Sequence, residues 1–130
     1  MNKISLLKIT LFVGGLYYIM GAIVHFFGLT VFPFYDGRLY SPYHDTVLAL
    51  VGIVLSLFLF TASTNPQKHD NIVKLIIASG IIAILFSIWI IFKIDFVTLG
   101  VPDKKFQTIV EIMLLVGFTG LLAYLRQPLS

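Results

Sequence analysis

IVKLIIASGIIAILFSIWIIF, the stretch at residues 72–92, contains one charged side chain, Lys74, in an otherwise uncharged and mainly apolar run. A helix needs about 20 mainly apolar residues to cross the ~30 Å hydrocarbon layer of a bilayer. Stretches of similar character lie on either side, at residues 42–62 and 104–125, and a fourth lies at residues 6–29. This fourth stretch exceeds the apolar core of a signal peptide and no A-x-A-like site follows it, so we expect it to be retained. The sequence therefore predicts an all-α integral membrane protein with four transmembrane helices.

The composition is that of a membrane protein rather than of a soluble domain. Hydrophobic residues make up 58% of the 130 residues and charged residues 12%, whereas soluble domains carry about 25% charged residues. Few residues remain outside the four stretches, so we predict a single domain over residues 1–130. The short connections favour an antiparallel bundle. The chain has no cysteine, which excludes disulfides, thiol redox chemistry and cysteine metal ligands.

The distribution of basic residues gives a predicted orientation. Four spans place both termini on one side, and cytoplasmic loops are enriched in Lys and Arg. With the N-terminus inside, the cytoplasmic side carries Lys3, Lys8, Lys68, Lys74 and Arg126, and the opposite side carries Arg38, Lys93, Lys104 and Lys105. The bias is small, but the first span has a basic N-terminal flank, so we expect both termini to be cytoplasmic in a bacterial inner membrane. The net charge of +3 is thus a determinant of topology, and no nucleic-acid partner is expected.

Small residues recur on one face of each predicted helix. In the first span, Gly14, Gly21 and Gly28 share a stripe with Tyr18 and His25, because residues three or four positions apart lie on the same face. The other stripes contain Asp45, Ala49, Gly52 and Ser56 in the second span, Ser79, Ala83 and Ser87 in the third, and Gly117, Gly120 and Ala123 in the fourth. Helices in lipid associate through such residues, so the stripes predict the packing faces of the bundle.

Ionisable residues within the spans are the strongest functional signal. His25, Asp45 and Glu111 come from three different predicted helices and lie, in the predicted topology, at one membrane level near the outer surface. Such groups are rare, costly and often functional, so we expect a polar site at the outer mouth of the bundle. Structural alternatives stay open: a hydrogen-bonded histidine, a carboxylate that favours a helix N-terminus, or an ion pair of Glu111. The basic residues considered for that ion pair are Lys93, Lys104 and Arg38.

The first connection supplies further candidates. Residues 35–45, YDGRLYSPYHD, combine acidic, basic and aromatic side chains at high density. Such a loop fits a lid over the mouth of the bundle, although aromatic residues also anchor re-entrant loops at the lipid headgroups. Gln107 joins the site because it shares a helix face with Glu111. The ligand-binding residues added by this reasoning are Asp36, Arg38, Tyr43, His44 and Gln107.

No motif assigns a reaction or a cofactor. His25, His44, Asp45 and Glu111 offer metal-ligating atoms, but no H-x-x-x-H or E-x-x-H spacing connects them, and the question of a metal stays open. The sequence contains neither a Gly-rich phosphate loop nor a G-x-S-x-G nucleophile motif. We therefore predict no cofactor and no catalytic residue, and the sequence favours a role other than that of an enzyme.

The layout is similar to that of small bacterial four-helix membrane proteins such as the DoxX-like group, although no family motif is present. Small multidrug exporters also have four spans, but they carry a glutamate at the middle of the first span. This chain has Tyr17 and Tyr18 there. No family assignment is made from the sequence.

Two functions are consistent with these features. In the first, the polar site at the outer mouth binds or translocates a proton, an ion or a small amphipathic ligand. In the second, the protein is a non-catalytic accessory or scaffold subunit of a larger membrane complex, and its polar residues satisfy contacts between helices. The expected partners are the lipid bilayer and either other membrane subunits or further copies of the chain.

Overall fold

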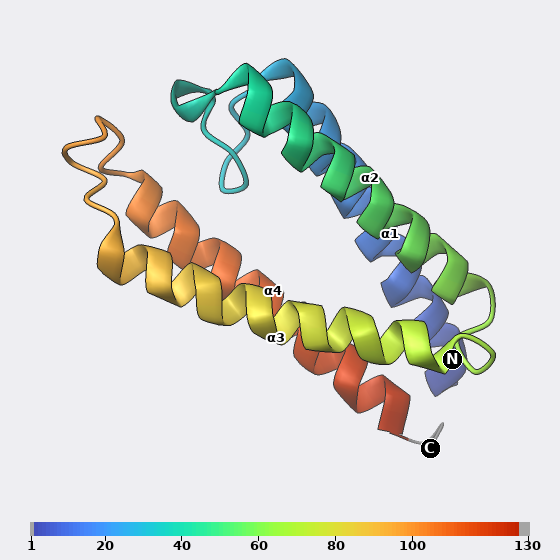
Figure 1. The fold of residues 1–130 in the computed structure, drawn as a ribbon. Helices are drawn as coiled ribbons and strands as arrows, with labels where there is room; N and C mark the ends of the chain where they lie inside the picture. The colour runs from blue at the N-terminus through green and yellow to red at the C-terminus, as the bar shows by residue number, and fades with distance from the viewer. Residues whose placement is uncertain (1, 128–130) are drawn as a thin grey trace.

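The computed structural model describes residues 2–127 and contains four long helices (Figure 1). They are α1 (Lys3–Phe27), α2 (Pro42–Thr64), α3 (Asp70–Lys93) and α4 (Lys104–Arg126), and a short 3-10 helix, η1 (Gly37–Leu39), lies in the first connection. Each long helix is long and apolar enough to cross a membrane. The all-α class with four membrane-length helices is therefore confirmed, and it indicates a multi-pass membrane protein. The helices begin and end within three residues of the predicted spans.

The ends of the first two helices follow local sequence signals. The side chain of Asn2 accepts a hydrogen bond from the Ser5 backbone N–H at 2.8 Å and so caps the start of α1. Gly28 ends α1 with a φ of 64°, in the left-handed region that glycine adopts without steric cost. Ser41 precedes α2 and Pro42 occupies its first turn, where its missing N–H removes no helical hydrogen bond. The cap itself comes from Asp45, whose carboxylate accepts from the Ser41 backbone N–H at 2.6 Å.

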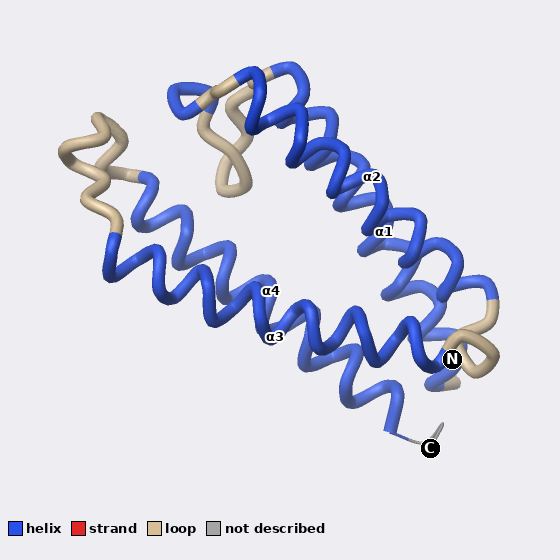
Figure 2. Tube along the Cα trace, viewed as in Figure 1, coloured by secondary structure: helices blue, strands red, loops and turns tan. Residues whose placement is uncertain are grey.

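The long helices are arranged as two pairs. α1 packs along α2, and α3 packs along α4, with further contacts between α1 and α4 and between α2 and α3. Figure 1 shows that the two pairs meet near the chain termini and diverge toward the first and third connections, which lie at the opposite end. We call these the terminus end and the loop end. The loops and turns, drawn in tan in Figure 2, lie at these two ends.

The apolar core lies at the terminus end, where all four helices meet. Seven residues with exposed fractions of 0–1% form it: Leu7 and Leu11 of α1, Leu59 and Ala62 of α2, Val73 of α3, and Leu122 and Leu125 of α4. An ion pair between Arg126 and Asp70, at 2.6 Å, joins α4 to α3. The ammonium of Lys3 lies 4.4 Å from the centre of the Tyr124 ring and joins α1 to α4. At the terminus end, the four helices are therefore in direct contact.

The predicted stripes of small residues form packing faces only in part. A Cβ atom placed on Gly52 would lie 3.2 Å from the Tyr18 carbonyl oxygen, so this glycine permits the close approach of α2 to α1. Gly80, which the stripes did not include, permits a similar approach to Thr119, because a Cβ there would collide with the threonine hydroxyl. The prediction was wrong for three other glycines, since a Cβ on any of them would meet no atom within 4 Å. These are Gly21, Gly117 and Gly120.

Candidate functional site

A cavity of about 360 Å³ lies between the two helix pairs. Its lining comes from α1 (Val13, Gly14, Tyr17 and Tyr18), the first connection (Phe34), α3 (Ser87) and α4 (Glu111, Leu114, Leu115 and Phe118). The lining is mainly apolar, and the carboxylate of Glu111 is its acidic group. The volume lies at the lower end of the range of about 300–1,000 Å³ that is usual for small-molecule sites. The cavity is therefore large enough for a small organic ligand.

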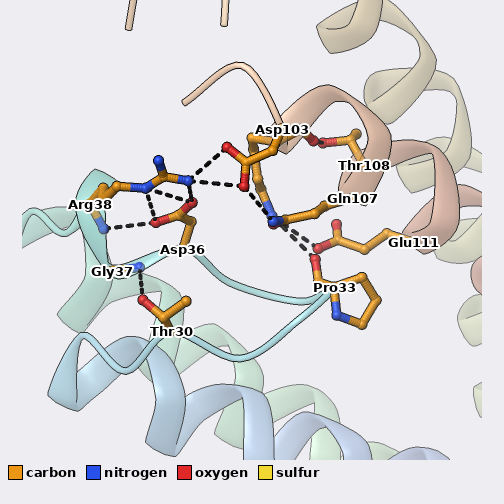
Figure 3. A network of polar contacts seen from close by, with 10 residues as sticks. Thr30, Pro33, Asp36, Gly37, Arg38, Asp103, Gln107, Thr108 and Glu111 are labelled. Carbon is orange, nitrogen blue, oxygen red and sulfur yellow. Dashed lines mark hydrogen bonds and ion pairs between the residues drawn. The ribbon is translucent and has the colours of Figure 1, made fainter. Parts of the chain in front are cut away.

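The carboxylate of Glu111 has a basic partner on its own helix. Oε1 of Glu111 lies 3.2 Å from the Nζ atom of Lys104, two turns earlier in α4. The same ammonium donates to the carbonyl oxygen of Pro33 in the first connection at 3.3 Å. In Figure 3 the oxygens of Pro33 and Glu111 point toward one place, where this ammonium lies. Of the structural alternatives left open for Glu111, the ion pair with Lys104 is the one that is present.

His25 and Asp45 form a second contact, within the α1–α2 pair. Nδ1 of His25 and Oδ1 of Asp45 are 2.7 Å apart, and the Asp45 side chain is only 4% exposed. The ring of Tyr35 lies against the His25 ring, with 4.3 Å between the centroids. Burial and the neighbouring carboxylate of Asp45 raise the pKa of Tyr35 above its ordinary value. The structure thus brings together two of the three predicted residues, while Glu111 lies on the other helix pair with Lys104 as its partner.

A polar network crosses the loop end. The guanidinium of Arg38, in η1, contacts the Asp36 carboxylate through Nε at 3.0 and 3.1 Å. Its Nη2 donates to both oxygens of Asp103, the residue before α4, at 2.8 and 3.0 Å. Figure 3 shows Arg38 between these two carboxylates. We call Asp36, Arg38 and Asp103 the loop clasp, because they connect the first connection to the start of α4.

The electrostatics of the loop clasp follow from this geometry. The Asp36 side chain is only 1% exposed, whereas Arg38 and Asp103 are about half exposed. Hydrogen bonds from Arg38 hold the pKa of Asp36 and that of Asp103 below their ordinary values. Both carboxylates are therefore charged at neutral pH. The clasp is a charge-assisted contact between the two helix pairs, and its half-exposed Arg38–Asp103 part is open to screening by salt.

The remaining predicted residues lie outside the cavity lining. Gln107 donates from Nε2 to Asp103 at 3.2 Å, and its buried Oε1 has no hydrogen-bond partner among residues 2–127. Nδ1 of His44 lies 3.0 Å from the Ser41 hydroxyl. Tyr43 is 75% exposed and contacts the edge of the His44 ring. These residues therefore lie at the loop end and do not line the cavity.

Sequence reasoning missed most of the aromatic wall of the cavity. Tyr17 entered it only as a contrast with another family, and Tyr18 also as a member of the stripe in the first span. Tyrosine hydroxyls at the middle of a span were an available signal. Phe34 gave no signal, because its place in the cavity depends on how the first connection folds back between the pairs. Its ring contacts that of Tyr17, with centroids 5.1 Å apart. Phe118 lines the cavity from α4 and also covers Gly14.

The described part of the chain contains no group of three or more His, Asp or Glu side chains arranged to hold a metal ion. The comparisons with protein-family models, with curated proteins and with solved structures find no match to this chain.

Proposed function

We propose that the chain is a membrane-embedded antiparallel four-helix bundle that binds a small amphipathic ligand in the cavity between its two helix pairs. The observation that supports this best is the carboxylate of Glu111 in the lining of an otherwise mainly apolar cavity of about 360 Å³. The apolar body of a ligand would contact Val13, Leu114 and Leu115, and its polar group would lie beside Glu111.

The free-energy cost of a carboxylate inside a membrane span supports a functional role for Glu111. Ionisable groups inside membrane spans are expensive and commonly mark the path or the site of a ligand. The lining is mainly apolar, and charges interact more strongly in apolar surroundings than at a solvated surface. Glu111 would therefore contribute both affinity and orientation to a ligand that carries a complementary group.

The proposed orientation places the cavity toward the outer leaflet of a bacterial inner membrane. The basic flank of the first helix, with Lys3 and Lys8, favours a cytoplasmic N-terminus, and four spans then place the C-terminus on the same side. The loop end, with Glu111 and the loop clasp, would face outward. The His25–Asp45 contact, within the α1–α2 pair, would lie at the same end.

The exposure of α3 favours a second candidate function, that of an accessory subunit. Val73 is the one buried residue of this helix, and its large apolar side chains, such as Phe86 and Phe92, are exposed. Lipid tails or the helices of another subunit would satisfy such a surface equally well. Ligand binding in the cavity would still distinguish the first function from the second.

A matched pair of substitutions tests the ligand-binding function. Val13 lines the cavity and is 54% exposed, whereas Val116 is 49% exposed and is not part of its lining. Val13→Trp should fill the cavity, and Val116→Trp makes the same change on the outside of α4. The probes are octanol, octyltrimethylammonium and octanesulfonate, which share an eight-carbon tail and differ in head-group charge.

The measurement is the melting temperature of each variant in nanodiscs of zwitterionic lipid. We expect at least one probe to raise the melting temperature of the wild type and of Val116→Trp, but not that of Val13→Trp. Partitioning of the probes into the lipid is common to both variants, so it cannot produce this difference. Equal shifts in the two variants, or no shift with any probe in the wild type, would contradict ligand binding in the cavity.

A further inference from the structure

We propose that the ligand of the cavity is a cationic amphipath, and that Lys104 is an internal cation that competes with this ligand for Glu111. The inference rests on the proposed function and specifies the chemistry of the same site. Three observations support it: the negative charge of Glu111 in the cavity lining, the aromatic residues of that lining, and the position of Lys104 outside it.

The charge that the lining presents to a ligand is negative. Glu111 is the acidic residue of the lining, and the tyrosines there are neutral at physiological pH. Lys104 is not part of the lining, and its side chain is only 12% exposed. Its ammonium is held between Glu111 and the Pro33 carbonyl. The charged group in the cavity lining is therefore the carboxylate, and its partner ammonium lies outside the lining.

The aromatic wall of the cavity favours a cation as well. Tyr17, Tyr18 and Phe34 lie close together, with centroid distances of 5.3 Å between the tyrosines and 5.1 Å between Tyr17 and Phe34. Phe118 adds a ring from the other helix pair. Aromatic faces attract ammonium groups, and this attraction increases when water is excluded. A carboxylate beside several aromatic rings is thus suited to an ammonium group that carries an apolar body.

Lys104 occupies the partner position that the ligand cation would take. Two like charges beside one carboxylate in apolar surroundings repel each other, so the ammonium of the ligand and that of Lys104 compete for Glu111. A displaced Lys104 keeps the Pro33 carbonyl as a hydrogen-bond acceptor. A ligand then needs favourable contacts of its apolar body to displace Lys104, which selects hydrophobic cations over small hydrated ions. The exchange requires no proton transfer.

The test compares two neighbouring lysines. Lys104→Met keeps an unbranched apolar side chain but removes the competing charge. Lys105→Met makes the same change at an exposed position for which no ion pair with the described residues is seen. Affinity for octyltrimethylammonium is measured by calorimetric titration into nanodiscs, with Val13→Trp discs as the blank for partitioning into lipid. Octanol and octanesulfonate are titrated in parallel.

The wild type should bind octyltrimethylammonium more tightly than octanol, and octanesulfonate least tightly. Glu111→Gln should remove this order, because its amide carries no charge. Lys104→Met should bind octyltrimethylammonium about fivefold or more tightly than the wild type, as expected when a competing ion pair of about 1 kcal/mol is removed. Lys105→Met should bind it as the wild type does. Lys104→Arg should bind it more weakly, because a guanidinium holds a carboxylate through two hydrogen bonds.

Each other outcome contradicts a defined part of the argument. Tighter binding of octanesulfonate than of octyltrimethylammonium would overturn the cationic ligand while leaving the cavity as a ligand site. Weaker cation binding in Lys104→Met than in the wild type would show that Lys104 assists the ligand. If Lys104→Met does not fold, Lys104→Arg becomes the test of the competition for Glu111. Unchanged or tighter binding of octyltrimethylammonium by Lys104→Arg would contradict that competition. Failure of all three probes would contradict the proposed function itself.

Discussion

The terminus end and the loop end hold the two helix pairs together through different interactions. At the terminus end, seven apolar residues from all four helices interlock with at most 1% exposure. At the loop end, the pairs diverge (Figure 1), and Arg38 reaches across from the first connection to Asp103. Close packing of side chains is stiff to small displacements, whereas an ion pair between half-exposed side chains is weak and screened by salt. The cavity therefore lies on the side of the packed core where the two pairs diverge.

The largest expected effect separates the two ends by stability. Leu122 is fully buried at the terminus end, and its neighbour Leu121 is 39% exposed. Leu122→Ala should lower the free energy of unfolding by about 2–4 kcal/mol, because the cavity that it creates loses packing contacts with the three other helices. Leu121→Ala should cost much less, since that side chain is already partly exposed in the folded protein. Pulse proteolysis in detergent would measure both, and equal losses would contradict a packed terminus end.

The second prediction concerns the loop clasp. Arg38→Gln should increase the mean distance between the first and third connections and broaden the distribution of that distance. It should lower the melting temperature less than Leu122→Ala does. Electron spin resonance between labels at Leu39→Cys and Leu99→Cys would measure the distance, since the chain has no other cysteine.

The control for this substitution is Arg126→Gln, which removes an ion pair between α4 and α3 at the terminus end. It should leave the distance between the two connections unchanged. A distance that responds to Arg126→Gln but not to Arg38→Gln would reverse the roles that we assign to the two ends.

The smallest expected effect is the response of the loop clasp to pH. Arg38 lowers the pKa of both Asp36 and Asp103, so the contribution of these carboxylates to stability is complete above the ordinary aspartate pKa of about 3.9. It is lost as the pH falls through their lower pKa values in the folded state. The same two spin labels should report a constant distance from about pH 7 to about pH 5 and a broader distribution below about pH 4. Arg38→Gln should be broad at every pH, and an identical transition in that variant would exclude the clasp as its cause.

The fold could be predicted in outline because the length and apolar character of a span are local properties of the sequence. The divergence of the helix pairs could not, because it depends on which small residues meet a neighbour. Gly52 lies against Tyr18 and Ala22, while Gly117 and Gly120 in an equally regular stripe meet no atom within 4 Å of a Cβ position. Helical spacing places residues on a common face but does not say whether that face contacts protein or lipid.

The candidate site was predictable only in pieces. The common membrane level of His25 and Asp45 suggested their proximity, and Lys104 was one of three basic residues considered for Glu111. The structure selects Lys104, whose ammonium lies 3.2 Å from Glu111 and also donates to the Pro33 carbonyl oxygen at 3.3 Å. Pro33 and Phe34 reach that place because the first connection folds back between the pairs, and its path depends on tertiary contacts that no local pattern encodes.

The divergence of the two helix pairs also gives the molecule unequal cross-sections along its length. In the proposed orientation, the helices are gathered in the cytoplasmic monolayer and spread apart in the outer one (Figure 1). The protein then occupies more area in the outer monolayer than in the inner one. A bilayer that bends so as to expand its outer monolayer accommodates this shape better than a flat bilayer does. In that orientation, local membrane curvature would influence where the protein accumulates.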